Sequence, residues 1–363
     1  MKKIDRLSCG MGIGGWLTNY KRFNVLPQEW RLCLTIGDME HFESYITESD
    51  VAYIASLGMD HIRLGFDQIV IEEEPYVLRK EIVEILHKFV SWCEKYNLRV
   101  VLNMHKAIGN YCDILEEKGL MQDEELQERF VAVWVKLEEE FSQNNDIIFE
   151  LLNEIVNSSA EEWNLVAEKA IKAIRELNKE RLIIVGGIEW NRPVGLDNLK
   201  VYDDENIIYT FHCYAPDEFT HQQGVLQAKP LYYNRKMSWP CDDIERYREF
   251  HRCFGEFDAY HNLEKMDIQF LREYMQPAAN FMKRNPDKVL WCGEFGTIRH
   301  ADMKSRENWM RDMITILKEN DIPYCVWNYL STPNDGNRFS LVDDDNRRIL
   351  SEEMARIIRG EVE

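Results

Sequence analysis

The sequence has no uninterrupted apolar stretch that approaches the ~18 residues required by a membrane-spanning helix. Its first residues, MKKIDRLSCGMGIGGW, include two lysines. However, Asp5, Arg6 and four glycines interrupt the apolar segment that a secretion signal would need. We therefore expect no membrane span and no signal peptide here. The expected location is the cytoplasm, unless a leader has been removed.

Basic charge is scarce. Lysine and arginine together number 44 against 64 acidic residues, which gives a formal net charge of −20. Such a field repels nucleic acids, anionic membrane surfaces and polyphosphates. The charge balance therefore predicts that the chain binds neither nucleic acid nor membrane, and it is compatible with a neutral sugar.

Patterns for disulfides, metals and dinucleotides are also missing. The nine cysteines are odd in number and no two have C-x-x-C spacing, which favours free thiols in a reducing compartment. Neither H-x-H nor H-E-x-x-H occurs, so no metal site is predicted. The glycine-rich GMGIGG (10–15) is followed by WLTN. A dinucleotide-binding site would instead have a helix there and, further on, an acidic residue that binds the ribose. We therefore expect no cofactor.

Short apolar runs alternate along the chain with longer segments of helical spacing. Stripes such as Ile82, Leu86, Phe89 and Cys93 predict amphipathic helices. Continuous apolar runs are typical of strands covered on both faces. Together they favour the α/β class and a (β/α)₈ TIM barrel formed by a single catalytic domain over 1–363. The predicted strands are 9–15, 61–66, 98–105, 146–154, 181–187, 206–214, 288–296 and 323–330.

Two stretches, 17–47 and 215–287, are longer than a connection between barrel elements requires. The second is rich in aromatic residues and separates the sixth and seventh predicted strands. We expect it to form a helical insert over the face where the strands end. Whether the insert forms a wall of a substrate cleft or only packs against the barrel is open.

Polar side chains interrupt the apolar strands near their carboxyl ends, which is the functional face of such a barrel. A buried polar group costs a few kcal/mol unless it is paired, so eight of them at strand ends indicate a site rather than chance. They are Arg63, His105, Asn153, Glu154, His212, Tyr214, Glu294 and Trp327.

Glu154 and Glu294 end the fourth and seventh predicted strands, so they are expected to face each other across the barrel mouth. Glycosidic bond cleavage needs such a pair: one protonated carboxyl for the leaving oxygen and one carboxylate for attack. Arg63 and Tyr214 would keep Glu294 ionised, whereas Glu154 has no obvious cationic partner.

Two further strand-end residues fit a sugar in the reactive subsite. Asn153 can donate a hydrogen bond to a sugar 2-hydroxyl, and Trp327 offers a flat apolar floor for the ring. Taken singly, His105 and His212 would more often be structural histidines. Beside the other six residues, a functional role is the better interpretation.

The chain resembles glycoside hydrolase family five, the cellulase family of retaining barrels. The resemblance is carried by HIRLGFD (61–67), NMH (103–105), LLNE (151–154), FHCY (211–214), GEFG (293–296) and VWN (326–328). It implies Glu154 as acid/base and Glu294 as nucleophile. It also implies a reactive subsite completed by Arg63, His105, Asn153, His212, Tyr214 and Trp327.

Within that family the chain is most similar to a bacterial branch that includes a clostridial endoglucanase, cellulase C, which also cuts mixed-linkage β-glucan. FELLNE (149–154), FTHQ (219–222), YNR (233–235) and the size of the insert carry this similarity. The resemblance implies cleavage of β-1,4 and mixed β-1,3/1,4 glucans or gluco-oligosaccharides. FHCYAPDEFTHQ (211–222) and the long acidic loop after the last strand depart from the pattern, so endo or exo action stays open.

Three tryptophans outside this set could stack on sugar rings. Trp190 directly follows the fifth predicted strand, and we expect it to bind substrate. Trp16, in a tight turn, is as well explained as core, and Trp239 in the insert is undecided. The partner predicted overall is a β-linked oligo- or polysaccharide, and the oligomeric state is not predicted.

Other functions remain possible on the same pattern. An exo-acting β-glucosidase, a β-mannosidase or a mannanase would use the same two glutamates. A non-catalytic carbohydrate-binding barrel would not need both of them. A barrel lyase or isomerase would need a metal or a lysine base at strand ends, and the sequence offers neither there.

Overall fold

The computed structural model describes residues 3–19, 39–111, 119–224, 234–253, 263–332 and 335–362. Eight parallel strands close into a barrel in the order β1-β10-β9-β8-β7-β6-β5-β2, which confirms the predicted (β/α)₈ fold. The strands are β1 (Cys9–Leu17), β2 (His61–Asp67), β5 (Arg99–Lys106), β6 (Ile147–Glu150), β7 (Ile183–Gly186), β8 (Ile207–Cys213), β9 (Val289–Phe295) and β10 (Tyr324–Val326). Each overlaps one of the eight predicted runs.

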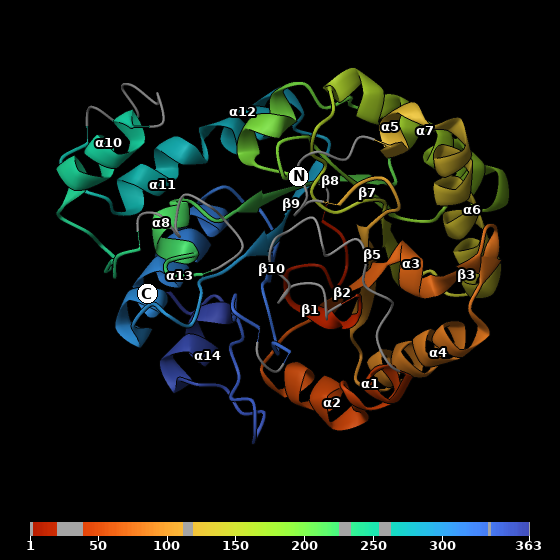
Figure 1. The fold of residues 1–363 in the computed structure, drawn as a ribbon, viewed down its shortest axis with the longest axis horizontal. Coiled ribbons are helices and arrows are strands. Elements are labelled where there is room, and N and C mark those ends of the chain that lie inside the picture. The colour runs from red at the N-terminus through yellow and green to blue at the C-terminus, as the bar shows by residue number, and fades with distance from the viewer. Residues whose placement is uncertain are drawn as a thin grey trace.

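Amphipathic helices surround the strands (Figure 1). In α4, the apolar stripe that includes Ile82, Leu86 and Phe89 is buried. The capping box of Ser159 and Glu162 fixes where α7 begins. The larger barrel helices are α2 (Glu48–Ser56), α4 (Lys80–Lys95), α6 (Glu124–Phe141), α7 (Ala160–Leu177), α12 (Gln276–Arg284) and α13 (Met303–Glu319).

Smaller elements fill the connections, and the sequence patterns did not predict most of them. They are α1 (Met39–Ser44), α3 (Gln68–Ile71), the hairpin β3 (Glu72–Glu74) and β4 (Val77–Leu78), α5 (Gly119–Gln122), η3 (Pro193–Asp197) and α14 (Glu352–Ile358). Much of the long segment 17–47 lies outside the described residues.

Much of the described part of the β8–β9 connection is helical, although residues 234–243 are not. It contains α8 (Asp217–Thr220), α10 (Ile244–Arg252), α11 (Ile268–Tyr274) and α12. α12 packs on β9 and η3, the position of an ordinary barrel helix, whereas α11 packs on α13. α10 and α11 project beyond α13 at one side of the molecule (Figure 1). Among the insert aromatics, Tyr232, Tyr233, Phe254, Phe257 and Tyr260 lie outside the described residues.

Two tryptophans whose role the sequence left open are core residues. Trp16 lies in β1, is 1% exposed and donates a hydrogen bond to the Phe42 carbonyl. Trp239 is equally buried and donates to Asp312. Neither ring presents a face to solvent, because packing in the barrel wall and in the insert covers both.

Side chains inside the barrel form two layers. The layer at the amino ends of the strands is mostly apolar, with the buried His61 ring against Trp291, and its apolar residues are separate from the larger core between strands and helices. It comprises Leu7, Val101, Ile148, Ile184, Ile208, Val289, Trp291 and Cys325. Towards the carboxyl ends the inward side chains become polar, and the candidate site is built on them.

Two further sequence expectations concern membranes and cysteines. Among the described helices, none combines the length and apolar character needed to cross a bilayer. Seven cysteines fall within the described ranges, and each is a free thiol. Cys213 is buried in the outer core, away from the side of the strand that carries His212.

Candidate active site

An irregularity in β9 directs Glu294 into the barrel mouth. Phe211 of β8 pairs with Cys292, but the next residue, His212, pairs with Glu294, so Gly293 is an extra residue in the strand. Such a bulge re-aims the side chain that follows it. Glycine is required, because a Cβ at position 293 would lie 2.6 Å from Thr210 Oγ1.

Glu294 is 3% exposed, and both of its carboxylate oxygens accept hydrogen bonds. Arg63 Nη1 donates to Oε1, and the Tyr214 hydroxyl donates to Oε2 at 2.9 Å. The two contacts expected for this carboxylate are therefore present. Burial, followed by the charges of Glu294 and Glu154, raises the pKa of Tyr214 well above its usual value, so Tyr214 stays a donor.

Glu154 lies beyond the end of β6, not on it. The predicted strand 146–154 ends at Glu150, and the chain then bends, with Glu154 in the left-handed region at a φ of 40°. The backbone still bonds to its neighbours, with Asn153 N donating to the Met104 carbonyl. This turn swings Glu154 over the mouth, where its side chain is 18% exposed.

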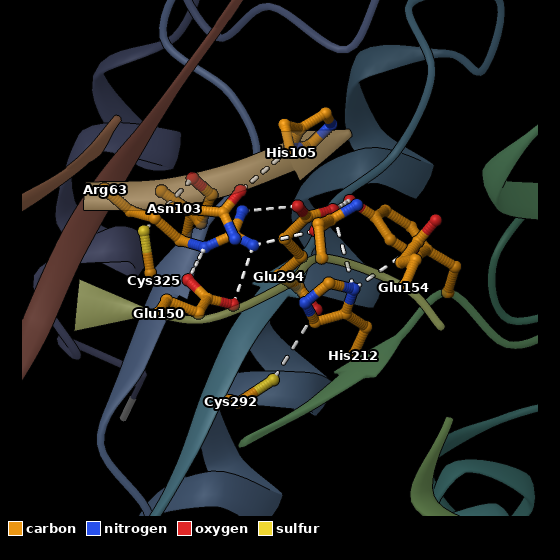
Figure 2. Close-up of polar contacts among 12 residues, drawn as sticks. Arg63, Asn103, His105, Glu150, Glu154, His212, Cys292, Glu294 and Cys325 are labelled. Carbon is orange, nitrogen blue, oxygen red and sulfur yellow. Dashed lines mark hydrogen bonds and ion pairs between the residues drawn. The ribbon is translucent and has the colours of Figure 1, made fainter. Parts of the chain in front are cut away.

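His212 lies between the two glutamates (Figure 2). Its Nδ1 is 3.1 Å from Glu154 Oε1 and 3.8 Å from Glu294 Oε2. One carboxylate oxygen of Glu154, one ring nitrogen of His212 and one carboxylate oxygen of Glu294 all lie within 4.8 Å of one another. Burial lowers the pKa of His212 from 6.5 to about 4, so the ring is neutral near pH 7 and adds no positive charge between the carboxylates.

The expectation that Glu154 has no cationic partner needs correction. Arg192, which follows β7, interacts electrostatically with Glu154 and forms a 3.0 Å ion pair with Asp217 of α8. Sequence reasoning missed this residue because its approach depends on the turn after β7. In that turn Glu189, Trp190 and Asn191 all have positive φ.

Asn153 is oriented by the same arginine that binds Glu294. Its Oδ1 accepts a 2.8 Å hydrogen bond from Arg63 Nη2. Its buried Nδ2 has no hydrogen-bond partner among the described residues. The amide N–H group is therefore available to an acceptor that enters the mouth.

His105 and Trp327 form a stacked pair on the other side of the mouth. Their ring centroids are 5.3 Å apart, with 5° between the planes, and the Arg63 guanidinium lies 5.9 Å from the Trp327 ring. Asn103 Oδ1 is 2.9 Å from His105 Nδ1 and fixes the imidazole. Trp327 is only partly buried, so part of its ring remains accessible.

Trp190 lies at the rim and is partly exposed. Its backbone N donates to the Ile155 carbonyl at 3.2 Å, which ties it to the turn that carries Glu154. The Arg192 guanidinium lies 5.2 Å from the centre of its ring. The structure therefore brings the eight strand-end residues together and places Trp190 beside them.

Glu150 is a site residue that sequence reasoning missed. It is fully buried, and its oxygens accept from Arg63 Nε at 2.5 Å and from Nη2 at 2.9 Å. A signal existed, because a glutamate stands two residues after Ile148 in an apolar strand. With a period of two residues, both side chains point into the barrel.

Glu154, His212 and Glu294 are also the one set of described residues close enough to share a metal ion. Their surroundings suit another chemistry better. Both oxygens of Glu294 are already engaged, and the cationic Arg63 lies directly against them. A cation there repels a second cation, whereas it stabilises a negatively charged carboxylate.

Comparison with known proteins gives a consistent picture. The family model of cellulase (glycosyl hydrolase family 5) matches residues 28–332. Endoglucanase C of Acetivibrio thermocellus is 35% identical, over 96% of this chain and 97% of its own length. Cellodextrinase A of Ruminococcus flavefaciens is 26% identical, over 89% and 85% respectively.

Two solved structures share the fold. A hyperthermophilic endo-beta-1,4-glucanase in complex with substrate has a TM-score of 0.73 at 21% identity, covering 98% of this chain and 97% of the other. Thermotoga maritima Cel5A in complex with cellobiose has a TM-score of 0.71 at 23% identity, covering 97% of each chain.

Proposed function

Because this chain belongs to glycosyl hydrolase family 5, the cellulase family, we propose that Glu154 is its acid/base and Glu294 its nucleophile. The observation that carries the proposal is the close approach of these two carboxylates, with one oxygen of each within 4.8 Å. Retaining enzymes hold their carboxyl groups about 5–5.5 Å apart, whereas inverting enzymes leave roughly 6.5–9.5 Å for a water molecule. The spacing supports retention.

The first step forms a glycosyl-enzyme. A Glu294 oxygen attacks the anomeric carbon while the bond from that carbon to the leaving sugar breaks, and Glu154 gives its proton to the leaving oxygen. Arg63 and Tyr214 hold the Glu294 carboxylate in position for attack, since each donates to one of its oxygens. Neutral His212 lies between the two carboxylates without neutralising either one.

The second step releases the sugar. Glu154, now ionised, takes a proton from water, the water oxygen bonds to the anomeric carbon, and the ester bond to Glu294 breaks. The two displacements together retain the configuration. Asn153 Nδ2, which has no described protein partner, would donate to the sugar 2-hydroxyl in both steps. Trp327 and His105 would support the sugar in the reactive subsite, and Trp190 a neighbouring one.

The proposed substrates are β-1,4-linked glucans or gluco-oligosaccharides, including mixed β-1,3/1,4 glucan. Two relatives that match this chain over most of their own length, an endoglucanase and a cellodextrinase, support this substrate class by their names. A Thermotoga maritima Cel5A structure contains mannotriose, so β-mannan is the second candidate. A product profile on cello-oligosaccharides, mixed-linkage glucan and mannan separates the two and distinguishes endo from exo action.

The roles of the two glutamates are tested with Glu154→Ala. This variant should lose most activity on natural glucans but keep activity on aryl glycosides whose leaving groups need no proton. Azide should restore turnover in the variant and give a β-glycosyl azide, while wild-type enzyme with azide is the control. An α-glycosyl azide would mean inversion and would contradict the two-step scheme.

We further propose that residues 1–363 act as one catalytic domain that carries its insert within 215–287. Packing of α12 on β9 and of α11 on α13 supports this, since it joins the insert to the barrel. A cytoplasmic location is also proposed, because the buried cysteines of the strands are free thiols. Fractionation of expressing cells tests the location.

A further inference from the structure

Arg63 contacts two buried carboxylates rather than one. Glu150 accepts from its Nε and Nη2, while Glu294 accepts from its Nη1 (Figure 2). Arg63 and Glu150 are both fully buried. Burial lowers the pKa of Arg63, but the charges of Glu150 and Glu294 outweigh burial, and its pKa lies above the usual value. The positive charge of Arg63 is therefore shared by two negatively charged carboxylates, Glu150 and Glu294.

A second carboxylate is not needed merely to hold a buried arginine in this fold. Arg306 is 2% exposed and hydrogen-bonds to neutral acceptors, with Nε donating to Thr297 Oγ1 and Nη2 to the Ser340 carbonyl. The charge of Glu307 also acts on Arg306, but without a hydrogen bond between the two side chains in the described part of the chain. Burying an extra carboxylate is costly. Arg63 differs from Arg306 in that it hydrogen-bonds two carboxylates, one of them the proposed nucleophile, and this contact indicates a role in the chemistry.

We propose that Glu150 is a positioning residue. It competes with Glu294 for the positive charge of Arg63, and this competition keeps Glu294 a strong nucleophile. The inference rests on the proposed role of Glu294. Glu150 occupies the Nε side of the guanidinium, which leaves Nη1 for Glu294. It therefore fixes the plane of Arg63 and limits how strongly that cation stabilises the nucleophile.

The consequence differs between the two chemical steps. Without the charge of Glu150, Arg63 would stabilise the Glu294 carboxylate more strongly and lower its basicity. A less basic carboxylate attacks the anomeric carbon more slowly, so the ester to Glu294 forms more slowly. The same carboxylate is a better leaving group when water attacks the anomeric carbon, so the ester bond breaks faster. Glu150 thus balances formation against breakdown of the glycosyl-enzyme.

The test is Glu150→Gln in the whole chain, with dinitrophenyl β-cellobioside as substrate. The acidic limb of the profile of kcat/KM against pH reports the ionisation of the essential carboxylate, here the proposed nucleophile Glu294, in the free enzyme. It should move to lower pH by about one unit, as expected when a nearby charge is removed. The pre-steady-state burst of dinitrophenol should shrink, because less glycosyl-enzyme accumulates.

Glu138→Gln is a matched control. Glu138 and Arg181 form a second buried pair, 1% and 0% exposed at their side chains, with Arg181 Nε donating to Glu138 Oε2 at 2.6 Å. Arg181 also donates to the Ile147 carbonyl, at the opposite end of β6 from Glu150. This variant should lose stability but keep the acidic limb and the burst of the wild-type enzyme.

Glu150→Asp extends the test should the glutamine variant not fold. It keeps the charge but withdraws it by one methylene, so the limb should move in the same direction by less than half as much. A wild-type limb in every folded Glu150 variant would overturn the inference, as would an equal shift in Glu138→Gln. Full activity in Glu294→Gln would instead overturn the proposed function, so the two failures are distinguishable.

Discussion

The two layers inside the barrel differ in chemistry although the same strands build them. Val101 of β5 and Ile148 of β6 lie side by side in the lower, apolar layer. Two residues further along, Asn103 and Glu150 lie side by side in the upper layer and are fully buried. A step of one pleat period therefore separates side chains that stabilise the barrel from side chains that serve the site.

The upper layer carries the energetic cost of burying polar groups, whereas the lower layer stabilises the fold. Buried apolar groups in the lower layer gain free energy from leaving water, whereas buried polar groups lose it unless they are bonded. The upper layer bonds many of its groups to Arg63. It leaves Asn103 Nδ2, Asn153 Nδ2 and His212 Nε2 without partners among the described residues. Substitutions in the two layers should therefore fail in different ways.

The largest effect is expected in the upper layer, from Glu294→Gln. An amide cannot attack the anomeric carbon, so kcat should fall by about 10⁴-fold or more, as for other removed nucleophiles. Arg63 keeps Glu150 as a charged partner, so the melting temperature should change by only a few degrees. Steady-state kinetics and thermal unfolding measure the two quantities. Turnover near the wild-type level in this variant would show that Glu294 is not the nucleophile.

Ile148→Ala should produce the opposite result in the lower layer. Ile148 is fully buried, and removing such a side chain typically costs about 2–5 kcal/mol of unfolding free energy. The folded variant should keep kcat/KM within about twofold, since no site residue loses a bond. Urea unfolding and activity of the folded fraction test this. A large loss of activity with unchanged stability would contradict the separation of the layers.

A smaller effect, dependent on pH, is expected from His212. Its pKa is lowered from 6.5 to about 4, mainly by burial. Between these values the unfolded chain binds a proton that the folded chain does not, so stability falls as the pH drops from 6.5 towards 4. His212→Gln should make that fall shallower between pH 6.5 and 5.5 in urea unfolding. Ile148→Ala removes no titratable group and should keep the wild-type slope.

Much of this arrangement follows from patterns local in the sequence. The eight strands were predictable because strands buried on both faces read as apolar runs, and helices such as α4 and α7 because their apolar stripes face the barrel. The site residues followed from the rule that barrel function lies at the carboxyl ends of strands. The nine predicted residues do gather at that end.

The remainder depends on how neighbouring strands pair. The bulge at Gly293 and the turn after Glu150 set the directions of Glu294 and Glu154, and neither is visible in a strand's own pattern. Glu150 was not predicted because the apolar pattern placed the end of this strand at Glu154, four residues further on. The burial of Trp16 and Trp239 comes from packing between distant segments, which spacing alone does not encode.

A pair of single-carbon additions tests the separation of the two layers within one strand, β1. A Cβ on Gly14 would lie 2.5 Å from the Trp327 ring, whereas a Cβ on Gly10 would clash with the His61 ring. Gly14→Ala should push Trp327 out of place and lower kcat/KM by about tenfold, because small displacements at a site are costly. Gly10→Ala should instead lower stability by about 1–3 kcal/mol and leave kcat/KM nearly unchanged in the folded enzyme. If both variants lost activity to the same extent, the layers would be coupled through β1 and could not be treated as separate.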